Sequence, residues 1–157
     1  IMHEAPLNKV LGYFELGKEQ GADPILSGKQ VLQETGGFYL SPTIFDQVDP
    51  NARIAQEEIF GPVLSVIGFK DEAEAIAIAN NSTFGLAAYV ATQNLGRVRR
   101  LGDELRSAIT QVIATDKPSG GNLSISFEAH KQSGGGFEGG VRGLEAYTVA
   151  SAVICFT

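Results

Sequence analysis

The sequence is poor in the residues from which disulfides and metal sites are built. It contains one cysteine and two histidines among 157 residues. A single Cys155 excludes an internal disulfide and a multi-cysteine metal site, and it fits a reducing compartment. No histidine pair has metal-ligand spacing, and the H-E-x-x-H and Walker A patterns are both missing. We therefore expect no metal site, and we predict a cytoplasmic location.

Clustered positive charge is also lacking. Twelve Lys and Arg residues against 18 Asp and Glu residues give a formal net charge of −6. Nucleic acids and anionic membranes attract clustered Lys and Arg, so we expect neither as the main partner. The one local group, at residues 97–100, is interpreted as a solvated helix face. No apolar run is long enough to cross a bilayer, and no signal peptide is recognisable.

What the chain does contain is enough apolar sequence for a folded core. Apolar residues make up 43% and charged residues 19% of the chain, which is typical of a globular protein. The chain begins at Ile1, with Met2 second. We therefore expect it to be a piece of a longer protein.

Helical and extended patterns alternate through the middle of the chain. Leu7, Val10, Leu11 and Phe14 form one apolar helix face, and Gly17 and Gly21 are expected to mark its end. Asp71 with Glu74 predicts a second helix start, and Asn94 a third. Strands are predicted at residues 38–44, 63–69, 86–91, 108–114 and 149–156. The alternation favours an α/β layer with parallel strands.

A carboxylate-rich turn stands at the centre of this pattern. Residues 56–62 read Q-E-E-I-F-G-P and run straight into the strand predicted at 63–69. Gly61 frees the backbone, while Pro62 restricts Gly61 to extended conformations. One carboxylate is suited to accept hydrogen bonds from sugar hydroxyls, and Phe60 to pack on a flat heterocycle. The alternative is a solvated acidic loop in which Phe60 packs on a core edge.

Other candidate motifs favour structural interpretations. Residues 134–139 match G-x-G-x-x-G, but a dinucleotide fingerprint needs an acidic residue about 20 positions on, and none is there. A close-packing glycine turn is the preferred interpretation. His3 and His130 are interpreted as solvated. Cys155 is interpreted as a small buried hydrophobe rather than a nucleophile, because no base lies near it in sequence.

Four segments in order along the chain resemble motifs of the NAD(P)-dependent aldehyde dehydrogenase family. Residues 37–43 (GFYLSPT) are similar to its G-Y/F-Y/F-x-x-P-T strand, and residues 56–63 resemble its E-E-x-F-G-P segment. Residues 80–87 (NNSTFGLA) resemble its N-x-S/T-x-F/Y-G-L-A segment. Residues 131–148 resemble its closing K-x-S-G-x-G-x-E…G-L-x-x-Y-T pattern. The resemblance covers only the C-terminal part of such an enzyme.

The resemblance implies an α/β fold: the parallel-sheet catalytic-domain part at residues 1–148, then an oligomerisation strand at 149–157. It implies that Glu58 accepts the hydroxyls of the nicotinamide ribose and that Phe60 packs near the nicotinamide ring. The cofactor would be NAD or NADP. Phe127 would line the aldehyde entrance. The implied partners are a small-molecule aldehyde in the parent enzyme and a second copy of the chain, bound through residues 149–157.

The resemblance also implies that the reacting groups lie elsewhere. The family's nucleophilic cysteine, its general-base glutamate and its dinucleotide-holding half all lie upstream of the matching residues. Thiolate attack and activation of water both need those groups. We therefore expect no catalytic residue in this chain and no activity from it alone. Cys155 aligns with the terminal strand and is not the missing nucleophile.

One segment departs from the family. Where the family has P-F-G-G-x-K, residues 126–131 read S-F-E-A-H-K. If the two glycines adopt backbone angles that only glycine tolerates, this loop must bend differently.

The leading hypothesis is therefore a fragment or truncated member of an aldehyde-oxidising enzyme. The alternative is a stand-alone, non-catalytic module that self-associates or binds a partner through its last strand. Residual nucleotide binding through Glu58 and Phe60 is a third possibility, expected to be very weak without a phosphate-binding helix.

Overall fold

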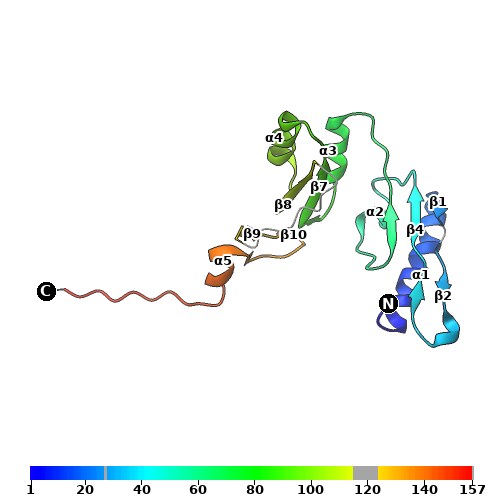
Figure 1. The fold of residues 1–157 in the computed structure, drawn as a ribbon, viewed down its shortest axis with the longest axis horizontal. Helices are drawn as coiled ribbons and strands as arrows, with labels where there is room; N and C mark the ends of the chain where they lie inside the picture. Colours follow the sequence, from blue (N-terminus) through cyan, green and yellow to red (C-terminus); the bar gives the residue numbers. More distant parts are fainter. Residues whose placement is uncertain (27, 115–123, 157) are drawn as a thin grey trace. The chain divides into compact units, whose positions relative to one another are not determined.

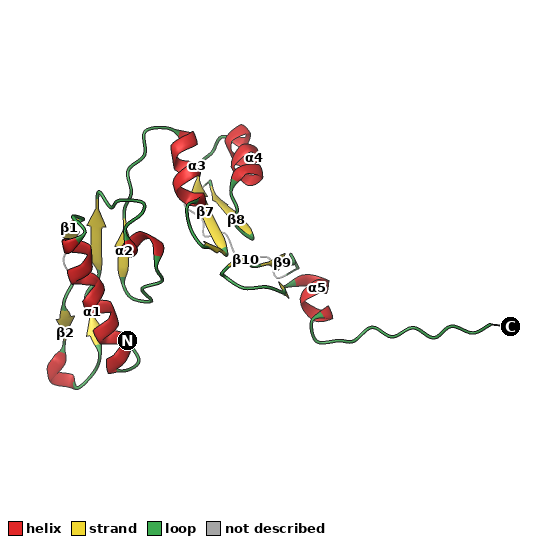
Figure 2. Ribbon diagram, turned by 180° about the vertical axis from the view of Figure 1, so that it is seen from behind, coloured by secondary structure: helices red, strands yellow, loops and turns green. Residues whose placement is uncertain are grey.

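The computed structural model describes residues 1–26, 28–114 and 124–156 (Figures 1 and 2). The chain divides into two compact units, Ile1–Ala75 and Ile76–Thr157. The division expected from the sequence, residues 1–148 followed by an oligomerisation strand at 149–157, stays a prediction. Among the helices of the described residues, none is both long enough and apolar enough to cross a membrane.

Helix α1 (Glu4–Glu19) carries much of the core of the first unit. Val10 and Phe14 on its predicted apolar face are buried, and the helix ends before Gly21, which has a φ of +80°. The prediction that Gly17 marks the helix end is wrong. Gly17 is buried within the helix, and a Cβ atom there would lie 2.7 Å from the Phe45 ring. The close approach of that ring explains this glycine.

A three-stranded sheet packs against α1. Its order is β1 (Asp23–Leu26), β4 (Thr43–Asp46) and β5 (Val63–Ser65). Strand β1 is antiparallel to β4, and β4 is parallel to β5. This confirms parallel pairing in an α/β arrangement. The core cluster comprises Val10, Tyr13, Phe14, Ala22, Phe45, Val48, Ala52, Ile54 and Ile59.

The extended segments of the first unit are shorter than predicted. The strand predicted at residues 38–44 is interrupted at Ser41 and Pro42. Its first part, β3 (Tyr39–Leu40), pairs with β2 (Gln30–Val31), and the 3-10 turn η1 (Gln33–Thr35) lies between these two strands in the chain. Its second part belongs to β4. A proline has no N–H to donate to a ladder, which fits the interruption.

Helix α3 (Glu72–Asn80) begins as its sequence predicts. The Glu74 N–H donates to the Asp71 carboxylate at 2.9 Å, and the Glu74 carboxylate accepts from the Lys70 N–H at 2.7 Å. These reciprocal bonds satisfy two N–H groups at the helix start. The helix begins in the first unit and ends in the second.

The second unit is built on a parallel strand–helix–strand arrangement. Strands β7 (Ala87–Ala91) and β8 (Ile109–Ile113) pair in parallel over five residues, with α4 (Leu95–Glu104) between them in the chain. The predicted cap is confirmed, because the Asn94 side chain accepts from the Arg97 N–H at 3.0 Å. Strand β7 is not buried as predicted; Tyr89 is 65% exposed. A two-stranded sheet is too small to enclose either strand.

The glycine-rich region contains more structure than predicted. Strand β10 (His130–Lys131) pairs with β6 (Phe84–Gly85), and β9 (Phe127–Glu128) pairs with β11 (Phe137–Glu138), both antiparallel. The short helix α5 (Gly140–Glu145) follows the G-x-G-x-x-G segment. The first part of the predicted polar loop, residues 115–123, lies outside the described residues.

Residues 148–156 have neither helix nor strand (Figure 1). A strand needs a hydrogen-bonded neighbour, and the described part of this single chain provides none for the segment. Val149 is 97% and Phe156 95% exposed. The prediction that Cys155 is buried is wrong, because the cysteine is exposed and no neighbouring strand covers it. The role of residues 149–157 in subunit contact stays a prediction.

Candidate functional site

The candidate site is the segment that joins α2 (Arg53–Gln56) to β5. Glu58 and Phe60 are both exposed, whereas Ile59 between them is buried in the core. Phe60 is 77% exposed, so its ring does not pack on a core edge, whereas the solvated acidic loop stays an alternative to the ligand site. Ile59 provides that packing. The structure therefore brings Glu58 and Phe60 together on one turn and directs both residues to the surface.

The backbone of Phe60 is strained. Its φ of +56° lies in the left-handed region, which a bulky aromatic residue rarely adopts. A conformation of this kind costs about 1–3 kcal/mol and persists only where the surrounding structure imposes it. Strained residues are enriched at functional sites, so the φ of Phe60 makes this turn a candidate for ligand contact.

The neighbouring Glu57 is held by three hydrogen bonds, a role that the sequence analysis missed. The Arg53 guanidinium donates through Nε to Oε1 at 2.6 Å and through Nη2 to Oε2 at 3.0 Å. The Tyr13 hydroxyl of α1 donates to Oε2 at 2.7 Å. The spacing of Arg53 and Glu57, four residues apart, is a sequence signal for the ion pair. Nothing in the sequence indicates Tyr13, which lies 44 residues away.

These contacts change the acidity of both partners. The Arg53 hydrogen bonds, followed by the Tyr13 hydrogen bond, lower the pKa of Glu57 from 4.5 to about 2. The hydrogen bond to Glu57 is also the largest cause of a raised pKa at Tyr13, followed by burial. Glu57 is therefore ionised at neutral pH and serves as a fixed anion that accepts hydrogen bonds.

We expect Glu57 to make the stability of the first unit depend on acid. Because the folded pKa lies below the unfolded value, the contribution is complete above about pH 4.5 and is lost as the pH falls towards about 2. The Glu57→Gln variant should lack this dependence. Urea unfolding of the unsubstituted chain and of Glu57→Gln at several pH values measures the pH dependence of the free energy of unfolding. A difference between the two proteins that does not shrink across this range would contradict the expectation.

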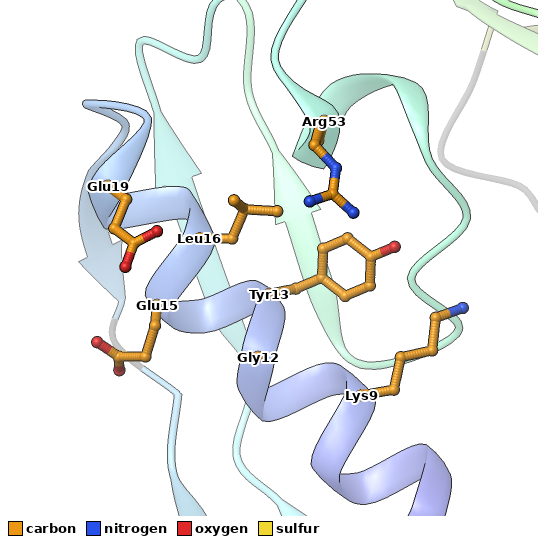
Figure 3. Close-up of a pocket in the computed structure, with 7 residues that line it drawn as sticks. All are labelled: Lys9, Gly12, Tyr13, Glu15, Leu16, Glu19 and Arg53. Carbon is orange, nitrogen blue, oxygen red and sulfur yellow. The ribbon is translucent and has the colours of Figure 1, made fainter.

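An open hollow of about 370 Å³ lies on the α1 side of this network (Figure 3). Figure 3 shows Lys9, Tyr13 and Arg53 towards one side and Glu15 and Glu19 towards the other. Gly12 and Leu16 complete its lining. Neither Glu58 nor Phe60 lines it. The hollow is therefore not the surface on which the predicted cofactor contacts lie.

Phe127, the third residue implied by the family resemblance, belongs to the second unit. It is half-buried in β9, opposite Glu138 of β11. The Ser126 hydroxyl donates to the Gly139 carbonyl at 2.9 Å. Glu128 and Ala129, which replace the family's two glycines, have no positive φ. In this chain the loop thus forms without the backbone angles that require glycine, while Lys131 has a φ of +54°.

Lys131 anchors that loop. Its ammonium group donates to the carbonyls of Ser82 at 2.8 Å and Asn80 at 3.2 Å, near the C-terminal end of α3. A cation is favourable there because it complements the unpaired carbonyls at a helix end. Two residues after Lys131, the Ser133 hydroxyl accepts a hydrogen bond from the Gly85 N–H at 2.9 Å. These bonds fix the position of β10 against β6.

The remaining candidate groups are dispersed. His3 and His130 are exposed. In the described parts of the chain, no three or more His, Cys, Asp or Glu residues come close enough together to hold a metal ion.

The parallel pairs β4–β5 and β7–β8, each with a helix between its strands in the chain, define this as a mixed α/β protein with parallel sheet elements. A model of the aldehyde dehydrogenase family matches residues 1–153. The chain belongs to the aldehyde dehydrogenase family.

Similar proteins support this membership. An aldehyde dehydrogenase-like protein of Schizosaccharomyces pombe is 39% identical over 153 residues, which are 98% of this chain and 30% of that protein. The structure of an indole-3-acetaldehyde dehydrogenase complexed with NAD+ has a TM-score of 0.84 at 45% identity, covering 91% of this chain and 28% of that one. The aldehyde dehydrogenase KauB of Pseudomonas aeruginosa has a TM-score of 0.86 at 43% identity, with 92% and 29% covered. The chain thus spans about a third or less of the length of these relatives.

Proposed function

We propose that this chain is the C-terminal part of a cytoplasmic enzyme that oxidises an aldehyde to a carboxylic acid with NAD(P)+. The observation that carries the proposal is the placement of Glu58 and Phe60. Both are exposed on one strained turn, in a chain whose family match covers residues 1–153. An indole-3-acetaldehyde dehydrogenase and a Mycobacterium tuberculosis aldehyde dehydrogenase among the similar structures were solved with NAD+.

The exposed groups on the turn fit the nicotinamide end of such a cofactor. A carboxylate accepts hydrogen bonds from two ribose hydroxyls, and an exposed aromatic ring packs against a flat heterocycle. When bound, the cofactor would accept a hydride from the substrate. In this proposal Glu58 fixes the ribose, Phe60 limits the positions of the nicotinamide ring, and neither residue transfers a proton. Phe127 would line the aldehyde entrance.

The exposed tail favours a second candidate function. Val149, Val153, Ile154 and Phe156 are all largely exposed. An unpaired extended segment with apolar side chains is suited to add to a sheet of another copy. In an intact enzyme this contact would build the homo-oligomer. In a stand-alone short chain it would make the protein a non-catalytic, self-associating module, and cofactor binding would then be very weak or absent.

The intact mass of the protein isolated from its natural source separates the two functions. We expect a mass far above the 16.6 kDa of this chain, together with aldehyde-dependent reduction of NAD+ or NADP+. The 157-residue chain on its own should reduce neither cofactor. A natural protein of the smaller mass, or turnover by the short chain, would overturn the proposal.

A further inference from the structure

Helix α1 contacts the candidate turn at three points. The Lys9 ammonium group donates to the Glu58 carbonyl at 2.9 Å, and the Tyr13 hydroxyl donates to the Glu57 carboxylate at 2.7 Å. Gly61 lies directly on the Val10 side chain, since a Cβ atom at position 61 would come within 2.7 Å of it. The helix therefore contacts the turn before, at and after the exposed residues.

These contacts explain how a strained residue can stay in place without packing of its own. The Phe60 ring is 77% exposed, so its side chain contributes little to holding its φ of +56°. The turn is held instead by the buried Ile59 and by the groups that flank Phe60. Among those flanking contacts, the Tyr13–Glu57 bond is partly buried, and the Arg53 guanidinium donates to both oxygens of the same carboxylate.

We propose that Tyr13, through its hydroxyl, is a positioning residue that sets the pose of Glu58 and Phe60 towards the nicotinamide ribose of NAD(P). The inference rests on the proposed function of those two residues. Tyr13 itself touches neither substrate nor cofactor in this arrangement. The Tyr13 hydroxyl ties the Glu57 side chain to α1. This bond in turn restrains the backbone of residues 58–60. Lys9 assists by fixing the Glu58 carbonyl.

Position 13 allows a selective test because its ring and its hydroxyl do different things. The ring belongs to the hydrophobic core, with the residue 8% exposed, while the hydroxyl reaches Glu57 (Figure 3 shows the hydroxyl directed away from α1). Tyr13→Phe removes only the hydroxyl and leaves the core packing. Tyr39→Phe is the matched control, because Tyr39 lies in the same unit and is 50% exposed.

The experiment compares these variants with Glu58→Ala in the intact enzyme that carries this chain. For Tyr13→Phe we expect kcat/KM for NAD(P)+ to fall about tenfold, because Glu58 and Phe60 are no longer held in the pose that meets the cofactor. The KM for the aldehyde should change little, while the midpoint of urea unfolding should fall modestly through the loss of one partly buried hydrogen bond. Tyr39→Phe should change none of these values. A purely structural role for Tyr13 would lower the unfolding midpoint and leave the cofactor constants unchanged.

The outcomes separate the inference from the function on which it rests. If Glu58→Ala leaves the cofactor constants unchanged, the proposed role of Glu58 is wrong and the inference falls with it. If Glu58→Ala weakens cofactor use and Tyr13→Phe does not, only the inference is overturned. If Tyr13→Phe does not fold, Glu57→Gln replaces it in the test. The glutamine keeps the shape of the glutamate side chain and weakens its hydrogen bond with Tyr13. Unchanged cofactor use in Glu57→Gln would also overturn the inference.

Discussion

Replacing Phe45 by alanine should lower the free energy of unfolding of the first unit by about 3–5 kcal/mol, the usual loss for a large core aromatic residue. Phe45 is fully buried in β4, the central strand of its sheet, and its ring lies against Gly17 of α1. The glycine has no side chain that can fill the space left by the ring. The cavity therefore stays open, and the helix loses the contact of Gly17 with the Phe45 ring.

Hydrogen exchange of the α1 amides in the 157-residue chain measures this loss. Phe69→Ala is the matched control because the Phe69 side chain is 63% exposed in the same unit, and it should change stability by no more than about 0.5 kcal/mol. The amides of β7 and β8 in the second unit provide an internal reference. Equal protection of α1 in the two variants would show that Phe45 is not the centre of this core.

The second large effect is expected at Gly85. A Cβ atom there would lie 2.9 Å from the Arg106 carbonyl oxygen and 2.9 Å from the His130 Cβ, so Gly85→Ala forces backbone to move. Overpacking of this kind costs about 1–3 kcal/mol, and we expect the upper end because no flexible side-chain tip can yield. Strand β10 should separate from β6. The loop that carries Phe127 would then lose its fixed position.

Exchange of the Gln132 amide, which donates to the Thr83 carbonyl at 2.9 Å, measures that separation directly. Gly102→Ala is the control: Gly102 lies in α4, and an added Cβ atom would meet nothing within 4 Å. Alanine is a better helix former than glycine by about 1 kcal/mol, so this variant should be slightly more stable. Retained protection of Gln132 in Gly85→Ala would contradict the proposed crowding.

The elements that depend on local pattern could be predicted from the sequence. The apolar face of α1, the Asp71–Glu74 start of α3 and the Asn94 cap of α4 are all set by residues within one or two helical turns. The parallel pairing of β7 with β8 follows from the helix between them. Family motifs indicated Glu58 and Phe60, and the structure shows both residues exposed on one turn.

The contacts that join distant parts of the chain could not be predicted in this way. The approach of Phe45 to Gly17, the Tyr13–Glu57 bond and the Lys131 anchor each depend on how the backbone folds back on itself. Predicted burial failed for β7 and Cys155 for a related reason. An apolar strand pattern reports a surface that is suited to burial, and the described chain does not contain a layer that covers it.

Under the proposed function, the left-handed backbone of Phe60 sets stability against cofactor contact at a single position. Glycine adopts a φ of +56° without steric cost, and asparagine does so more easily than an aromatic residue. Phe60→Gly should thus relieve this strain, and under the proposed function it would also remove the ring that packs near the nicotinamide. In that proposal, the aromatic ring at position 60 is present at the expense of a more relaxed backbone.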